Sequence, residues 1–83
     1  MKSCTDVEMI RAWNDANVMS TYMRPEPLFV RGQGTRLWDS KGKSYLDFVS
    51  GIAVCSVGHC HPKLSQAIAE QAAALIHVSN LYL

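Results

Sequence analysis

The stretch Leu28–Val49 reads LFVRGQGTRLWDSKGKSYLDFV, and it decides the fold of this chain. Three short runs in it are rich in aromatic and β-branched residues, which favour strands. Glycine-containing turn signals separate these runs. The stretch therefore predicts a three-stranded antiparallel meander within residues 21–50. The predicted strands are Leu28–Val30, Leu37–Trp38 and Tyr45–Val49, and the predicted turns are Gly32–Gly34 and Ser40–Lys43.

A first helix is predicted before the meander, within residues 1–20. Thr5 and Glu8 have the spacing of a capping box, in which each side chain satisfies a free backbone N–H at a helix start. Apolar residues then recur at helical spacing. Pro25 and Pro27 end this pattern, because a proline biases the residue before it toward extended geometry.

A loop and a second helix are predicted after the meander. Residues 51–61 show neither the period of a helix nor that of a strand, so they form the loop. Pro62 suits the first position of a helix, where its missing N–H costs nothing. An apolar stripe then predicts a helix over residues 62–78. The stripe consists of Leu64, Ile68, Ala72 and Leu75 or Ile76. The fold class is therefore an α+β arrangement of helix, meander, loop and helix.

Length and composition limit the possible functions. The chain has 83 residues, 48% of them hydrophobic, with a formal net charge of +1. A domain of this size buries too little surface to be very stable alone. The near-zero charge gives no reason to expect nucleic acid or a membrane as partner. Asp6 and Glu8 interrupt the apolar run that a signal peptide needs, and three cysteines show no disulfide framework, so we expect a cytoplasmic protein.

The loop sequence GIAVCSVGHCHP, residues 51–62, allows a metal site, a redox site or a purely structural loop. The candidate metal ligands are Cys55, His59, Cys60 and His61. Three of them are adjacent in sequence and cannot readily face one zinc ion, and no Cys-x-x-Cys pair is present for redox chemistry. We therefore expect a structural loop without a metal. In it Cys55 is buried, Gly58 makes a tight turn and His61 caps the second helix.

Five segments follow one another in a distinctive order between Tyr22 and the end of the sequence. They are Tyr22–Asp39, Gly42–Phe48, Ser50–Val54, Gly58–Pro62 and His77–Asn80. In this order and spacing the chain resembles the start of class III pyridoxal-phosphate aminotransferases, and within that class it is most similar to the acetylornithine branch.

The resemblance implies a fold and a reaction. The fold is fold type I, with a large α/β domain and a smaller domain, and the chain corresponds to the N-terminal fragment of such an enzyme. The reaction moves the δ-amino group of N2-acetylornithine to 2-oxoglutarate through pyridoxal 5'-phosphate, giving N-acetylglutamate 5-semialdehyde and glutamate in arginine biosynthesis. The enzyme is expected to be a homodimer with active sites at the subunit interface.

The resemblance also places four residues near the substrate. Gly51 and Ile52 fall where the family covers the substrate, and Ile52 replaces an aromatic residue of ornithine aminotransferases. Asn80 and Tyr82 fall near the active-site entrance, at the dimer boundary. The alternative for Ile52 is ordinary core packing.

No catalytic, cofactor-binding or metal-ligating residue is assigned in this chain. The four lysines, at positions 2, 41, 43 and 63, lie at the terminus, in the second turn or in the first helical turn, so none is expected to bind the cofactor. The fragment alone is therefore expected to be inactive. Other class III enzymes, acting on ornithine, succinylornithine or 4-aminobutyrate, remain alternatives, as does a freestanding small binding or structural domain.

Overall fold

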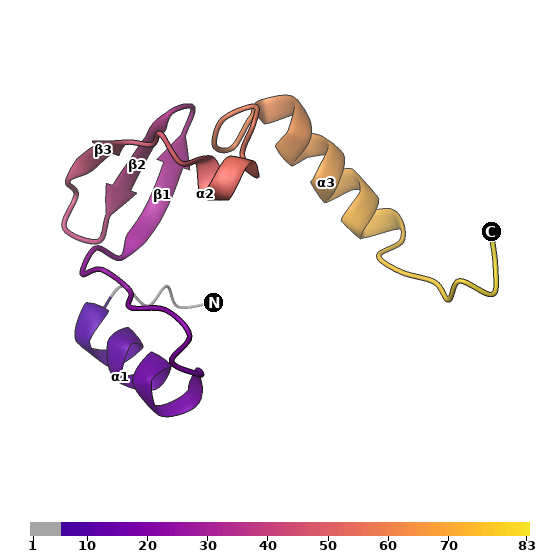
Figure 1. Cartoon of the computed structure of the whole chain (residues 1–83). Helices are drawn as coiled ribbons and strands as arrows, with labels where there is room; N and C mark the ends of the chain where they lie inside the picture. Colours follow the sequence, from indigo (N-terminus) through magenta and orange to yellow (C-terminus); the bar gives the residue numbers. More distant parts are fainter. Residues whose placement is uncertain (1–5) are drawn as a thin grey trace.

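The computed structural model describes residues 6–83 and contains the predicted order of helix, antiparallel sheet, loop and helix (Figure 1). The first helix, α1, spans Val7–Asn17. Asp6 caps it, because its side chain accepts a hydrogen bond of 3.1 Å from the N–H of Met9. The predicted cap Thr5 lies outside the described residues. The helix stops before residue 20 because Asn17 and the β-branched Val18 are poor helix formers, and Val18 is extended.

The meander is confirmed. Its strands are β1 (Phe29–Gln33), β2 (Arg36–Asp39) and β3 (Ser44–Leu46), hydrogen-bonded in the order β1-β2-β3 and antiparallel throughout. The predicted third strand, Tyr45–Val49, is too long. It ends at Leu46 because the next residue, Asp47, accepts hydrogen bonds from the following backbone and bends the chain.

The prediction of a turn at Gly32–Gly34 is wrong in its bounds. Gly32 pairs with Leu37 inside the sheet, and the turn is confined to Gly34 and Thr35. Gly34 has a φ of 58°, which only glycine adopts at little cost. Position 32 lies in the strand, and it requires glycine for a different reason: the later loop passes close to it.

The predicted loop 51–61 is also not fully irregular. A single helical turn, α2 (Ser50–Ala53), opens it, and the turn has unusual backbone geometry that is described below. A wider bend then carries the chain to the second long helix.

The last helix, α3, spans Pro62–Ala74, four residues less than the predicted 62–78. Pro62 occupies its first turn, and His61 caps it, accepting a 3.2 Å hydrogen bond from the N–H of Lys63 at Nδ1. The helix ends because Leu75 is extended and the residues after it include β-branched Ile76 and Val78. None of the helices in residues 6–83 is long and apolar enough to cross a membrane.

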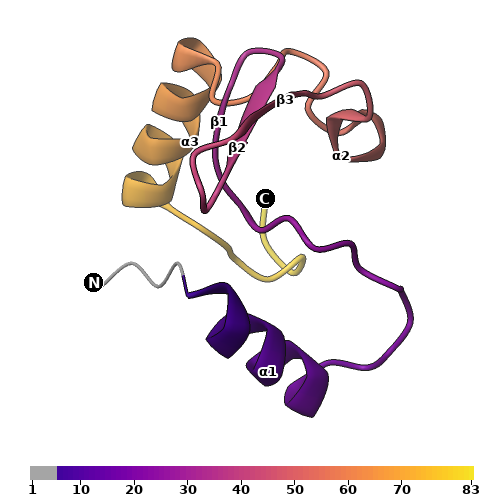
Figure 2. The same cartoon turned by 90° about the vertical axis from the view of Figure 1, so that its left-hand side faces the viewer.

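Little of this fold is buried. Among residues 6–83 no hydrophobic side chain is buried, and Asp39, 7% exposed, is the one buried residue. Within this range only neighbouring strands pack on each other as elements. Helix α3 runs away from the sheet (Figure 1), and the C-terminal segment leads on from the end of that helix (Figure 2). The side chains that would form a core are therefore displayed on open faces.

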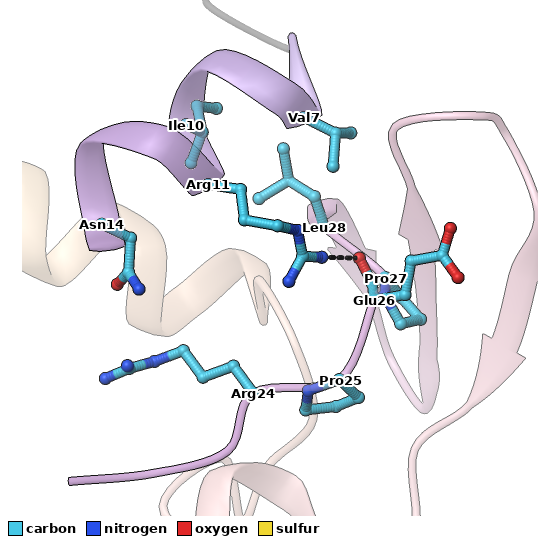
Figure 3. Close-up of a pocket in the computed structure, with 9 residues that line it drawn as sticks. All are labelled: Val7, Ile10, Arg11, Asn14, Arg24, Pro25, Glu26, Pro27 and Leu28. Carbon is cyan, nitrogen blue, oxygen red and sulfur yellow. Dashed lines mark hydrogen bonds between the residues drawn. The ribbon is translucent and has the colours of Figure 1, made fainter. Parts of the chain in front are cut away.

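A shallow cleft lies between α1 and the segment that precedes β1 (Figure 3). Val7 and Ile10 face Leu28 across it. Arg11 of α1 donates a 2.7 Å hydrogen bond from Nη2 to the carbonyl oxygen of Glu26. This bond is the main polar link between α1 and the chain leading into the sheet.

Candidate functional site

The turn α2 is left-handed. Four successive residues have positive φ: Ser50 (55°), Gly51 (64°), Ile52 (62°) and Ala53 (64°). The N–H of Ala53 still reaches the carbonyl oxygen of Val49 at 2.9 Å, so the segment closes a hydrogen-bonded turn of the opposite hand. This conformation crowds Cβ against the backbone and costs roughly 1–2 kcal/mol for each residue other than glycine. Such strain persists only where the surrounding structure enforces it.

The carboxylate of Asp47 holds the start of this turn. Its Oδ1 accepts hydrogen bonds of 2.9 Å from the N–H groups of Val49 and Ser50, and its Oδ2 lies 2.6 Å from Nε2 of His59. The N–H groups of Ser50 and Val49, followed by His59, hold the pKa of Asp47 below its ordinary value, and they outweigh the opposing effect of burial. Asp47 therefore stays ionised and keeps all three partners at neutral pH.

His59 in turn is fixed to the first hairpin. Its N–H donates to the carbonyl oxygen of Gly34 at 2.8 Å, and its carbonyl oxygen accepts from the N–H of Gly34 at 3.0 Å. A Cβ on Gly32 would lie 2.9 Å from the Cβ of His59, too close for any real side chain. A Cβ on Gly58, whose φ is 83°, would lie 3.1 Å from the carbonyl oxygen of Gly34. Glycines on both sides thus let the loop lie directly against the β1–β2 hairpin.

The turn presents Ile52 to its surroundings. Ile52 is 87% exposed, although it is apolar and its backbone is strained. Within residues 6–83 it therefore has no buried position, and core packing against other parts of a longer chain stays the alternative for it. Gly51 lies beside it, with only side-chain atoms of Val54 and Cys55 near the position of a Cβ. The structure thus brings Gly51 and Ile52 together on one exposed turn.

Asn80 and Tyr82 are not brought to that turn. They follow α3, a helix of 13 residues and so about 20 Å long, which leads away from α2 (Figure 1). Tyr82 donates its N–H to the carbonyl oxygen of Ser79 at 3.1 Å, and its side chain is exposed. Within this chain the four predicted site residues form two separate pairs.

The two histidines of the loop have separate structural partners. His61 caps α3 and Gly58 makes the predicted tight turn, while His59 is paired with Asp47. Cys55 is half-buried rather than buried, and Cys60 is exposed. In residues 6–83 no group of three or more His, Cys, Asp or Glu side chains could hold a metal ion.

Asp39 forms a second carboxylate network at the other end of β2. It accepts hydrogen bonds of 2.9 Å from the N–H groups of Lys41 and Lys43 and from the hydroxyl of Tyr45. Burial raises the pKa of Asp39, but the N–H of Lys43, the hydroxyl of Tyr45 and the N–H of Lys41 together bring it below its ordinary value. The network shapes the β2–β3 turn, which lies at the opposite end of β2 from Gly34.

Lys41 and Lys43 lie in the β2–β3 turn, as the sequence predicted, and both are exposed. Nζ of Lys41 is 4.0 Å from the exposed carboxylate of Glu26, and Nζ of Lys43 lies 5.2 Å from the centre of the Tyr45 ring. Lys63 belongs to the first turn of α3. The described lysines are therefore distributed over two different regions, neither of which is the left-handed turn.

The family model of class-III aminotransferases matches residues 18–83. The chain belongs to this family. Among curated members of the class-III aminotransferase family, the acetylornithine aminotransferase of Caldanaerobacter subterraneus subsp. tengcongensis is 62% identical over 65 residues, covering 78% of this chain and 16% of the relative. That of Nitrosomonas europaea is 57% identical over 67 residues, covering 81% of this chain and 17% of the relative. The chain thus spans about one sixth of the length of these curated relatives.

Solved structures of the family agree with the fold. The acetylornithine aminotransferase of Elizabethkingia anophelis matches 96% of this chain with a TM-score of 0.87 and 30% identity, over 20% of its own length. The ornithine aminotransferase of Toxoplasma gondii matches 95% of this chain with a TM-score of 0.84 and 30% identity, over 18% of its own length, and has partial occupancy of PLP at its active site. The segment is consistent with a part of the fold-type-I architecture.

Two features of the site were not predicted from the sequence. One is the role of Asp47, and the other is the left hand of the turn that follows it. The role of Asp47 has a local signal. An aspartate side chain readily accepts hydrogen bonds from backbone N–H groups two and three residues later, here those of Val49 and Ser50. The pairing with His59 depends on the fold and has no local signal.

Proposed function

We propose that this chain is the N-terminal segment of a PLP-dependent aminotransferase of the acetylornithine type. The complete enzyme would transfer the δ-amino group of N2-acetylornithine to 2-oxoglutarate. Identity of 56–62% to acetylornithine aminotransferases, over 65 to 68 residues, is the observation that supports this donor. The substrates of the proposed enzyme are thus an amino acid and a 2-oxo acid, and we expect a homodimer in the cytoplasm.

The cofactor would be held by other parts of such an enzyme. When bound, PLP supplies the carbonyl carbon that accepts the amino group and an electron sink for the bonds that break. The described residues do not fit a PLP site by themselves. Lys41 and Lys43 lie at the β2–β3 turn, and the N-terminus of α3 is occupied by its own cap, His61. No step that involves the cofactor is therefore assigned to this chain.

The proposed role of this segment is to cover the substrate. Ile52 offers an aliphatic surface on a turn that is held against the sheet, and an apolar cover of this kind excludes water during proton transfer. Asn80 and Tyr82, at the far end of α3, would serve the entrance of the site at the subunit boundary. Their distance from Ile52 within one chain is compatible with a site built from two subunits.

The exposed apolar faces support the proposal that this segment forms its core together with the rest of a longer polypeptide. A shallow groove along α3 and the residues that follow it has no covering residues in the described part, and its lining includes Ile68, Ala72, Leu75 and Ile76. Contiguous exposed apolar faces are typical of surfaces that other chain segments or partners cover. In the proposed enzyme the remainder of the polypeptide covers them.

A chimaeric enzyme tests the proposal. Residues 18–83 replace the matching segment of the Caldanaerobacter acetylornithine aminotransferase, and transamination of N2-acetylornithine, ornithine and 4-aminobutyrate is measured with 2-oxoglutarate. We expect N2-acetylornithine to be the preferred donor. If a folded, PLP-loaded chimaera prefers another donor, the proposed substrate is wrong and that donor takes its place. If such a chimaera is inactive with every donor, the proposal is contradicted.

An Ile52→Tyr variant of the chimaera tests the role of Ile52. The family resemblance places an aromatic residue here in ornithine aminotransferases, so we expect the kcat/KM ratio of N2-acetylornithine to ornithine to fall by roughly tenfold. Val57→Tyr is the matched control, because Val57 is also an exposed apolar residue of the loop but lies outside the turn. Equal ratios in the two variants would contradict a substrate-covering role for Ile52.

A further inference from the structure

We propose that Asp47 and His59 are positioning residues that fix where Ile52 lies over the amino-acid substrate. This inference rests on the proposed function, in which Ile52 covers the substrate. Neither residue is expected to touch the substrate. They act through the left-handed turn, which they connect to the β1–β2 hairpin.

The two residues form a continuous link from the sheet to the turn. Gly34 is bonded to His59 in both directions through backbone groups, and His59 contacts Oδ2 of Asp47 at 2.6 Å. The other oxygen of Asp47 accepts from the N–H groups of Val49 and Ser50, the residues that lead into the turn. The link leaves each carboxylate oxygen with at least one donor, so the carboxylate cannot rotate without losing a partner.

The turn needs such a link because its own backbone disfavours it. Ser50, Ile52 and Ala53 all have a left-handed backbone conformation, which is sterically unfavourable for residues that carry a Cβ. The cost is highest for Ile52, because it is β-branched. At its far end the turn is supported by two further bonds of 2.8 Å, from Oγ of Ser56 to the carbonyl oxygen of Ala53 and from the N–H of Cys55 to the carbonyl oxygen of Ser50. Without the Asp47 anchor we expect the turn to relax toward extended or right-handed geometry, which would move the Ile52 side chain.

Movement of Ile52 would be visible in catalysis. Misplacement of a substrate-contacting group by about 1 Å can lower a rate about a hundredfold. A loss of substrate cover should raise the KM for the amino donor, because a contact with the donor is lost, and should lower kcat, because water enters during proton transfer. The absorbance of bound PLP should remain unchanged, because none of the described residues is placed in the cofactor site.

The chain contains a matched control carboxylate. Asp39 also accepts from two backbone N–H groups and from one side-chain donor, the hydroxyl of Tyr45, and its pKa is likewise lowered. It lies at the opposite end of β2, away from the left-handed turn. Substituting Asp39 therefore measures the general effect of disturbing a carboxylate network in this sheet.

The experiment compares Asp47→Asn, His59→Ala, His59→Gln and Asp39→Asn in the PLP-loaded chimaera. We expect Asp47→Asn and His59→Ala to raise the KM for N2-acetylornithine roughly tenfold to a hundredfold, while Asp39→Asn lowers the melting temperature but leaves KM within about twofold. His59→Gln keeps a side-chain donor toward Asp47 and should restore most of the affinity. Equal KM values in Asp47→Asn and Asp39→Asn would overturn the inference.

A crystal structure of the Asp47→Asn chimaera gives a second, independent measurement. We expect Ile52 and Ala53 to lose their positive φ, and residues 50–53 with unchanged geometry would overturn the inference whatever the kinetics show. Where Asp47→Asn does not fold, the same comparison is made with His59→Ala. A chimaera without these substitutions that folds with a left-handed turn but has no transaminase activity would refute the proposed function. The structures of the variants would still show whether Asp47 and His59 hold the turn.

Discussion

Nε2 of His59 lies 2.6 Å from Oδ2 of Asp47, and this contact joins two ends of one loop that are twelve positions apart. Asp47 follows the last strand, and His59 pairs with Gly34 at the tip of the first hairpin. Everything between them, including the left-handed turn, is therefore held at both ends by the sheet. The contact explains how a segment with an unfavourable backbone keeps a defined position.

Ala53→Gly tests the strain in the turn. Glycine adopts positive φ freely, so relief of the strain should exceed the extra flexibility of the unfolded chain, and we expect the free energy of unfolding of the chimaera to rise by about 0.5–1 kcal/mol. Ala69→Gly, at an exposed position of the right-handed helix α3, is the control and should lower it by about 1 kcal/mol. Denaturant unfolding measures both, and destabilisation by Ala53→Gly would show that the turn is not strained.

Gly32→Ala tests the close approach of the loop to β1. The added Cβ would lie 2.9 Å from the Cβ and Cγ of His59, so the loop must move, and we expect a loss of about 1–3 kcal/mol of stability together with a displaced His59. Gly42→Asn is the control, because Gly42 has positive φ but no neighbour within 4 Å of a Cβ, and asparagine tolerates such backbone. Thermal unfolding and a crystal structure measure the effects; similar losses in the two variants would contradict a steric role for Gly32.

Tyr45→Phe tests the carboxylate network of Asp39. The hydroxyl of Tyr45 is one of three donors that lower the pKa of Asp39, so its removal should raise that pKa toward the ordinary value of 3.8 and leave the pKa of Asp47 unchanged. Carboxyl NMR titration of the chimaera measures both midpoints. An unchanged midpoint of Asp39 would mean that the hydroxyl does not stabilise its charge.

The lowered pKa values of Asp39 and Asp47 also predict how the stability of the fold changes with pH. Because the folded-state pKa of Asp39 and of Asp47 lies below the ordinary value of 3.8, their contribution to stability is fully present above about pH 4. It is lost as the pH falls through the folded values. The free energies of unfolding of Asp39→Asn and of the unaltered protein should therefore differ at pH 6, and the difference should shrink as the pH falls below 3.8; a difference that does not shrink in acid would contradict the hydrogen-bond pattern.

Ile68→Glu tests whether the apolar face of α3 is covered in the complete enzyme. A charge on that face would be buried without a partner, so we expect the chimaera to become insoluble or to lose its assembled state. Ala73→Glu, on the opposite side of the same helix, is the control and should remain soluble and active. Size-exclusion chromatography of the soluble fraction decides, and a fully assembled Ile68→Glu enzyme would show that this face stays open.

The sequence predicted the fold where the signals are local. Aromatic and β-branched runs between glycine turns gave the meander, and Pro62 with His61 marked the start of α3. Errors occurred at boundaries. Helix α3 was predicted too long because the apolar stripe continues to Ile76, but no packing partner in the described residues supports its last turn.

The candidate site was predicted only in part. Family resemblance placed Gly51 and Ile52 near the substrate, which stays a prediction, and the structure shows them on an exposed, strained turn. His59 was weighed as a zinc ligand, because a histidine near cysteines has the same local pattern in either role. Its actual partner, Asp47, lies twelve positions earlier and could not be chosen from spacing alone.

By itself the sequence determined the elements, their order and the family, because strand runs, proline positions and helix caps act through neighbouring residues. Only the tertiary structure decided the hand of residues 50–53 and the partner of His59. The physical reason is that a left-handed turn is unfavourable locally and exists only when distant groups hold it. Those groups, the Gly34 backbone and the Asp47 carboxylate, come together only after the hairpin has formed.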